Sequence, residues 1–131
     1  MFVVIITFII MNINPKDLPA FNPQAQLFKL LAHPTRVAIL EALRGGEQCV
    51  CHLEAALGLR QAYLSQQIAV LREAGVLQDR RDGWNIYYHV ARPEVFTVLD
   101  AAAALTGQSA AVSLRPPIQD CPCPKCTPRS E

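Results

Sequence analysis

All five cysteines of this 131-residue chain lie in two short clusters. The first is Cys49-Val50-Cys51, and the second consists of Cys121, Cys123 and Cys126. Thiolates this close together bind soft metal ions, exchange disulfides, or do both. An odd count, with no signal-peptide pattern ahead of it, is not typical of a secreted disulfide scaffold. The cysteines therefore predict metal or redox chemistry in a reducing, cytoplasmic setting.

The first eleven residues, Met1 to Met11, are strongly apolar. This run is too short to span a bilayer, and it lacks both a basic start and a small-residue cleavage pattern. We interpret it as the product of an upstream translation start, with Met11 as the true one. The alternative is an apolar segment that caps a dimer. Neither interpretation predicts a membrane protein.

The composition indicates one folded domain, because hydrophobic residues make up 51% of the chain. The net charge of +1 does not by itself announce a nucleic-acid binder. Basic residues nevertheless gather in the middle third, at Arg60, Arg72, Arg80, Arg81 and Arg92. A local basic surface of this kind is what a DNA reader needs, although a solvated face would have the same charges.

Hydrophobic periodicity, glycines and prolines predict a series of elements. Pro15, Pro19 and Pro23 are expected to break the chain before the first helix. The predicted elements are helices over residues 25–32, from Pro34 to Gly45-Gly46, from Cys49–Cys51 to Gly58 and over 61–74, a hairpin with strands 76–80 and 85–90, and a helix from Pro93-Glu94 to Leu105.

This order predicts a mainly α fold with a small β-hairpin wing (α+β): a winged helix-turn-helix. The expected domains are residues 1–22 as an N-terminal extension and linker, 23–107 as the DNA-binding and dimerisation domain, and 108–131 as a flexible tail rich in proline and cysteine. No arrangement of residues predicts an enzyme.

The helix over residues 61–74 has the pattern of a recognition helix. Leu64, Ile68 and Leu71 form an inward stripe, which leaves polar residues on the opposite side. Glutamine pairs with adenine edges, and arginines at the helix ends and in the wing suit phosphates or the minor groove. The predicted DNA-binding residues are Arg60, Tyr63, Ser65, Gln66, Gln67, Arg72, Arg80 and Arg81. An ordinary solvated helix and hairpin is the alternative, and the presence of the wing favours DNA binding.

Four stretches together resemble the arsenic-repressor (ArsR/SmtB) family of winged-helix metalloregulators: residues 31–40, 49–53, 64–68 and 71–77. The resemblance implies a homodimer that binds an inverted-repeat operator and releases it when metal binds. It places the dimer surface on the first and last helices, at Leu27, Leu30, Leu31, Phe96, Leu99 and Ala103. Burial of these residues in the domain core is the alternative.

The Cys-Val-Cys run looks like the metal box of this family. On a regular helix, residues i and i+2 point about 200° apart and cannot share a small ion. Cys49 and Cys51 can share one if Cys49 lies just before the helix, where the helix N-terminus also favours thiolate. The family's third cysteine is replaced by Glu54, and the usual Asp after the second by His52. The missing ligands are therefore expected from Cys121, Cys123 and Cys126, on a tail that can extend roughly 45–50 Å.

The number of sulfur ligands determines the expected ion. Three thiolates suit As(III) and Sb(III), by family resemblance, and Pb(II), whereas four suit Cd(II) or Zn(II). We expect His52 to be a surface residue, and no zinc site on the last helix, which holds only Asp100. The sequence leaves two alternatives open: a repressor of the same fold that senses thiol oxidation or persulfide, and a metal-binding module without DNA.

Overall fold

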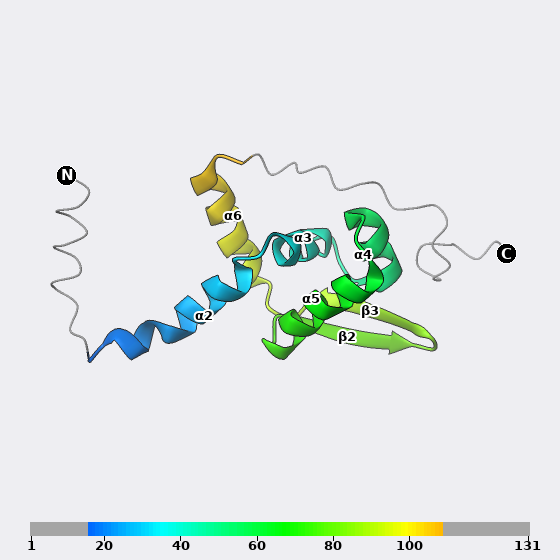
Figure 1. The fold of residues 1–131 in the computed structure, drawn as a ribbon, viewed down its shortest axis with the longest axis horizontal. Helices are drawn as coiled ribbons and strands as arrows, with labels where there is room; N and C mark the ends of the chain where they lie inside the picture. The colour runs from blue at the N-terminus through cyan, green and yellow to red at the C-terminus, as the bar shows by residue number, and fades with distance from the viewer. Residues whose placement is uncertain (1–15, 109–131) are drawn as a thin grey trace. The chain divides into compact units, whose positions relative to one another are not determined.

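A computed structural model describes residues 16–108 of the chain (Figure 1). These residues divide between Ala32 and His33 into two compact units. No helix among the described residues is long and apolar enough to cross a membrane. The tail cysteines and the apolar N-terminal run lie outside the described residues, so the predictions made for them remain predictions.

The first unit contains a short 3-10 helix, η1 (Leu18–Phe21), followed directly by α2 (Asn22–Leu31). The prediction that prolines break the chain before the first helix is wrong for Pro19 and Pro23. Each lies in the first turn of its helix, where the missing N–H has no helical partner to lose. The helix therefore begins three residues earlier than the predicted Ala25.

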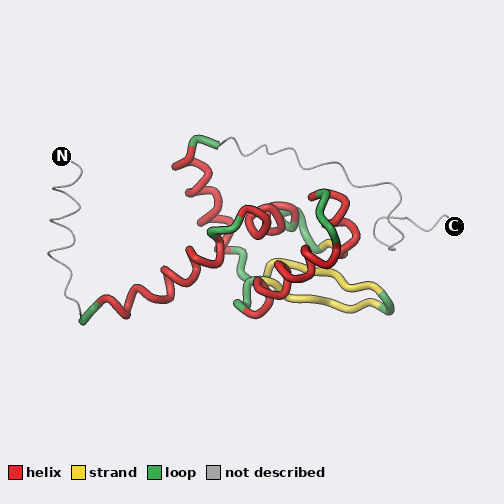
Figure 2. The backbone as a smooth tube through the Cα atoms, viewed as in Figure 1, coloured by secondary structure: helices red, strands yellow, loops and turns green. Residues whose placement is uncertain are grey.

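The second unit is a winged helix-turn-helix, as predicted (Figure 2). Its elements are α3 (Pro34–Ala42), β1 (Gln48–Cys49), α4 (Val50–Leu57), α5 (Gln61–Glu73), β2 (Leu77–Asp82), β3 (Asn85–Val90) and α6 (Glu94–Thr106). The turn between α4 and α5 depends on Gly58, whose φ of 65° is left-handed and ends α4.

A single layer of buried side chains packs the helices of this unit against its sheet. The fully buried side chains come from α3, α4, α5 and β2: Ile39, Leu40, Leu53, Leu64, Ile68, Leu71 and Leu77. Leu64, Ile68 and Leu71 are the stripe predicted for the recognition helix. Their burial turns the opposite face of α5 outward.

The wing is longer than predicted. The structure pairs Arg81 with Ile86 and Asp82 with Asn85, so β2 extends to Asp82 and the loop is only Gly83-Trp84. Gly83 has a φ of 61°, and among the described residues only glycines have a positive φ. A left-handed glycine at the first turn position is the type II′ pattern, which suits two-residue hairpins. Trp84 lies at the tip and is fully exposed.

Strand β1 is not predicted by any pattern in the sequence. This strand pairs antiparallel with β3, with Gln48 opposite Tyr88 and Cys49 opposite Tyr87. The sheet order is therefore β1-β3-β2. A two-residue strand is too short to show alternation, which is why the pattern of residues did not reveal it. It brings Cys49 into the same sheet as the wing.

Candidate thiol site and nucleic-acid interface

Cys49 occupies the junction between β1 and α4. Its backbone is extended, with φ −77° and ψ 161°, and it is the N-cap residue of α4. Its Sγ accepts a hydrogen bond of 3.3 Å from the backbone N–H of His52. Cys49 thus lies just before the helix, the position that allows its sulfur and that of Cys51 to face the same side.

The two thiols share one small cluster. Cys49 is 4% exposed and packs with Tyr87, and the half-buried Cys51 packs against this pair. The cap hydrogen bond orients the Cys49 sulfur at the N-terminal end of α4. The site therefore presents two soft donors close together, one of them oriented by the backbone.

Two thiols do not complete a metal site. Within residues 16–108, no third His, Cys, Asp or Glu side chain joins them in a group that could hold an ion. Three-coordinate As(III) or four-coordinate Zn(II) needs at least one more donor. Among the described residues, the donor set fits a soft ion in type and falls short in number.

An ion pair borders the thiol cluster. Glu47 accepts hydrogen bonds of 3.1 Å from Nε and 2.6 Å from Nη2 of Arg80 on β2. The guanidinium of Arg80 also lies over the Tyr87 ring, 4.8 Å from its centroid. Its pKa is raised above the ordinary arginine value, mainly by the hydrogen bonds to Glu47. Sequence reasoning missed Glu47 and Tyr87, because only the pairing of β1 with β3 brings them to this place.

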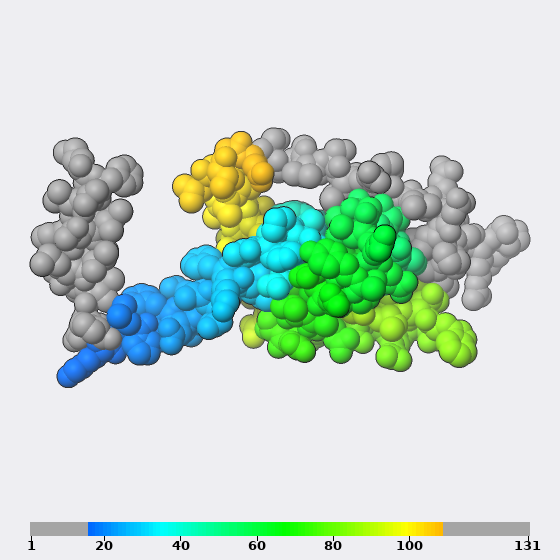
Figure 3. All heavy atoms as spheres, in the orientation of Figure 1, coloured from blue at the N-terminus to red at the C-terminus, as the bar shows by residue number. Residues whose placement is uncertain are grey.

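The outward face of α5 holds the predicted DNA-reading residues. Tyr63, Ser65 and Gln66 are exposed, and Arg60 is exposed at the N-cap of the helix. Atoms of α5 and of the wing adjoin one another in the space-filling view (Figure 3). This surface combines polar side chains able to reach base edges with arginines able to meet phosphates.

Two polar residues of this helix are held by α3. Nε of Arg36 donates a hydrogen bond of 3.0 Å to Oε1 of Gln67, which is half-buried. The hydroxyls of Thr35 and Tyr63 lie 3.2 Å apart. Sequence reasoning missed Thr35 and Arg36, and the signal available was their place on the first turn of a helix packed against α5.

The arginines of the wing region differ in their partners. Nε of Arg72 lies 3.6 Å from a carboxylate oxygen of Asp79, which ties the end of α5 to β2. Arg80 is held by Glu47 and Tyr87. Arg81 is exposed on the strand beside them. Arg81 is therefore the wing arginine whose approach to a phosphate requires the least rearrangement.

The predicted dimer residues lie in both units. Leu27, Leu30 and Leu31 are half-buried on α2, while Phe28 of the same helix is 61% exposed. On α6, Phe96 and Ala103 are half-buried, whereas Leu99 is only 7% exposed and belongs to the core of its own chain.

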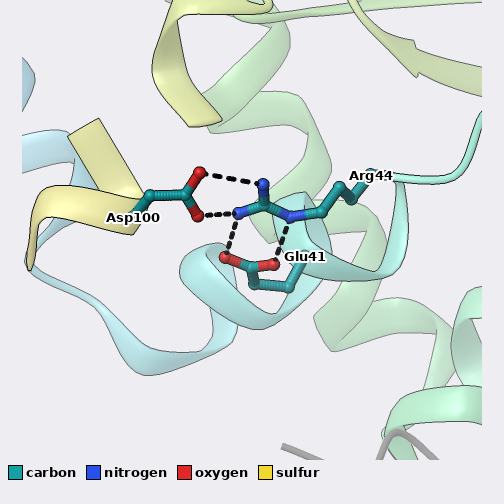
Figure 4. A network of polar contacts seen from close by, with 3 residues as sticks. All are labelled: Glu41, Arg44 and Asp100. Carbon is teal, nitrogen blue, oxygen red and sulfur yellow. Dashed lines mark hydrogen bonds and ion pairs between the residues drawn. The ribbon is translucent and has the colours of Figure 1, made fainter. Parts of the chain in front are cut away.

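A polar network fixes α6 against α3 (Figure 4). The Arg44 guanidinium forms ion pairs with Glu41 at 2.8 Å and with Asp100 of α6 at 2.7 Å. It also lies over the ring of Phe96, 4.7 Å from the centroid. The carboxylates raise the pKa of Arg44. Exposed ion pairs contribute little stability, so this network adds only modestly to the packing of α6 against α3.

The geometry defines a winged helix-turn-helix of the DNA-binding type, with a thiol pair at the start of its first helix. Residues 33–79 match the bacterial regulatory proteins of the arsR family. The biofilm growth-associated repressor of Agrobacterium fabrum is 39% identical over 99 residues, which cover 72% of this chain and 85% of that protein.

Two other proteins are similar to this chain. The arsenic resistance transcriptional regulator ArsR1 of Pseudomonas putida is 49% identical over 76 residues, 57% of this chain and 59% of that one. The crystal structure of the transcriptional repressor BigR from Xylella fastidiosa superposes with a TM-score of 0.63 at 33% identity, covering 71% of this chain and 96% of that one. The chain belongs to the arsR family, and it is a DNA-binding transcriptional repressor rather than an enzyme.

Proposed function

We propose that this repressor binds an inverted-repeat operator as a homodimer and releases it when Cys49 and Cys51 bind a soft metal(loid) ion. As(III) and Sb(III) are the preferred effectors, and Cd(II), Pb(II) and Zn(II) are the further candidates. The observation that carries the proposal is the shared cluster of the two thiols at the N-terminus of α4, the first helix of the DNA reader.

The remaining ligands are assigned to the tail. Cys121, Cys123 and Cys126 supply one thiolate for a three-sulfur site or two for a four-sulfur site. The tail is long enough to reach the thiol pair of its own subunit or of the partner. A soft ion bound there would join the start of α4 to the tail, because each thiolate is a fixed attachment point.

DNA reading is assigned to the outward face of α5. Ser65 and Gln66 meet base edges, and Tyr63 and Gln67 are held in place by α3. Arg60, Arg72, Arg80 and Arg81 contact phosphates. Dimerisation through α2 and α6, with Leu27, Leu30, Leu31, Phe96 and Ala103 as the contributing residues, places two such faces on the two half-sites.

Release requires that the ion bind the DNA-free conformation more tightly than the DNA-bound one. A coupling free energy of about 3 kcal/mol would weaken operator binding more than a hundredfold, at ~1.4 kcal/mol per factor of ten. A displacement of Cys49 would be passed on to the recognition helix α5, because Cys49 caps α4 and α4 packs on α5.

A second candidate is sensing by sulfur oxidation. The pair Cys49 and Cys51 can lose two electrons and two protons to an oxidant, such as a persulfide, and close a bridge without any further ligand. The observation favouring it is that the described residues supply two adjacent thiols and no third ligand. Both candidates keep the same fold, the same operator and the same release.

The experiment is operator binding by fluorescence anisotropy under strict reduction, titrated with arsenite, antimonite, cadmium, lead and zinc. Tight binding reversed by one of these ions supports the metal proposal and names the effector. Tight binding reversed only by a persulfide donor supports the oxidation candidate. Failure to bind any fragment from near its own gene, with thiols that still hold metal, would favour a metal-binding module without DNA.

A further inference from the structure

We propose that Tyr87, together with the ion pair between Glu47 and Arg80, carries the signal from the thiol pair to the wing. This inference rests on the proposed function, because it names the route by which effector binding at Cys49 weakens DNA binding. It makes Tyr87 and Glu47 positioning residues, which touch neither the effector nor the DNA.

The sheet places three side chains in one row. Cys49 lies opposite Tyr87 in the pairing of β1 with β3, and Arg80 lies opposite Tyr87 in the pairing of β2 with β3. Directly opposed residues in antiparallel strands project on the same face of a sheet. The row therefore runs from the thiol, across the phenol ring, to the wing arginine.

Each link of the row is a contact. The Tyr87 ring is 2% exposed and packs against Cys49, which is 4% exposed. The Arg80 guanidinium lies 4.8 Å from the centroid of that ring. Glu47, two residues before Cys49, then binds Arg80 through two hydrogen bonds of 3.1 and 2.6 Å. Because Glu47 is also linked to Cys49 along the backbone, Arg80 is connected to the thiol site in two ways, through Tyr87 and through Glu47.

A close-packed row transmits displacement. Buried side chains at native packing density cannot shift alone, and a bound ion adds volume and pull at the Cys49 sulfur. Displacing Cys49 disturbs the face on which Tyr87 packs, and it moves strand β1, which Glu47 directly precedes. Either motion changes the orientation of Arg80, and with it the wing that the proposed function places on DNA. The intact row belongs to the effector-free, operator-binding state.

The test measures the ratio of operator dissociation constants with and without saturating arsenite, and separately arsenite affinity in the absence of DNA. Sodium tetrasulfide replaces arsenite if arsenite leaves the wild-type complex intact. Glu47→Gln and Tyr87→Leu are expected to lower the ratio by at least about fivefold, the lower end of typical couplings. Their effector affinity without DNA should stay within about twofold of wild type, because the thiols are retained. Tyr87→Phe keeps the ring and should therefore show the same ratio as wild type.

Matched controls separate coupling from charge and from folding. Glu54→Gln removes the same charge from α4, so it corrects for any general gain in DNA attraction. Tyr88→Leu removes an aromatic ring of equal size from the neighbouring position of β3, which projects on the other face of the sheet. Neither control should change the ratio beyond about twofold, well below the couplings that connect sites. If Tyr87→Leu unfolds, Glu47→Gln and Tyr87→Phe still decide the question.

Equal release of wild type, Glu47→Gln and Tyr87→Leu overturns the inference while leaving the proposed function intact. The inference is also overturned, with the proposed function left intact, if the control Tyr88→Leu lowers the ratio as much as Tyr87→Leu does. Wild-type protein that binds no operator, or that is released neither by tetrasulfide nor by any of the five ions titrated above, overturns the proposed function itself.

Discussion

Arg36 of α3 donates a hydrogen bond of 3.0 Å to the side-chain oxygen of Gln67, whereas the neighbouring Gln66 of α5 is exposed. Two consecutive glutamines of the recognition helix therefore have different surroundings. Gln67 is held by the body of the domain, and Gln66 is available to a base edge.

This difference predicts different outcomes for two alanine substitutions. Gln67→Ala should lower the free energy of unfolding by about 0.5–1.5 kcal/mol, because a hydrogen bond between α3 and α5 is lost. Gln66→Ala should change stability by less than about 0.5 kcal/mol. It should instead weaken discrimination at one base pair of the operator by about 1–3 kcal/mol. Urea denaturation and binding to a set of single-base operator variants provide the measurements. Unchanged discrimination in Gln66→Ala would move base reading to another residue.

Substitutions at Cys49 should separate its role as the N-cap of α4 from its role as an effector-binding thiol. Serine is a strong N-cap residue and can accept from the His52 N–H, so Cys49→Ser should keep stability and operator binding while losing effector-triggered release. Cys49→Ala removes the cap as well, and should be less stable than Cys49→Ser by about 0.5–2 kcal/mol. Thermal unfolding and operator anisotropy distinguish the two. Loss of DNA binding in a folded Cys49→Ser protein would show that this thiol serves structure alone.

The tail prediction concerns residues outside those described. Replacing Cys121, Cys123 and Cys126 by serine should weaken arsenite binding at least tenfold, which corresponds to ~1.4 kcal/mol, because the thiol pair lacks its further ligands. Operator affinity without effector should not change. Competition with a fluorescent dithiol ligand measures arsenite affinity. A protein truncated after Gln108 serves as the second variant, and wild-type affinity in both would confine the site to Cys49 and Cys51.

The wing can be followed without a label, since Trp84 is the single tryptophan of the chain and is fully exposed at the hairpin tip. Its fluorescence should be that of an indole in water and open to quenching by acrylamide. Saturating operator DNA should reduce that quenching if the wing approaches the duplex. A high-salt buffer that dissociates the complex should restore it, because phosphate contacts depend on salt. Unaltered quenching in a saturated complex would place the wing tip away from DNA.

The dimer surface can be tested with one charge on each side of α6. Ala103→Glu introduces a carboxylate on the face predicted to meet the partner and should weaken the dimer at least tenfold, or ~1.4 kcal/mol. Ala101→Glu introduces the same charge about 160° around the helix and should leave the dimer intact. Sedimentation velocity across a dilution series compares the two proteins. Equal dimerisation of both variants would exclude this face of α6.

Sequence patterns predicted the helix-turn-helix, the wing and the last helix, because hydrophobic periodicity and glycines such as Gly58 report local preferences directly. They also placed Cys49 ahead of a helix. They did not reveal β1, and so they missed that Tyr87 and Glu47 border the thiols. Those contacts depend on pairing between residues about 40 positions apart, which no local pattern encodes. Nor could the pattern show that Arg36 holds Gln67, since both residues look like ordinary polar positions on separate helices.

Strand β1 has only two residues, and it is hydrogen-bonded to β3 alone. At a net contribution of roughly 0.5–1.5 kcal/mol per hydrogen bond, so short a strand has the least backbone pairing to lose of the three. The hairpin of β2 and β3 would survive that loss, because six residue pairs hold it together. Strand β1 is thus the part of the sheet held by the fewest paired residues, and its loss would separate Cys49 from Tyr87 while leaving the wing paired.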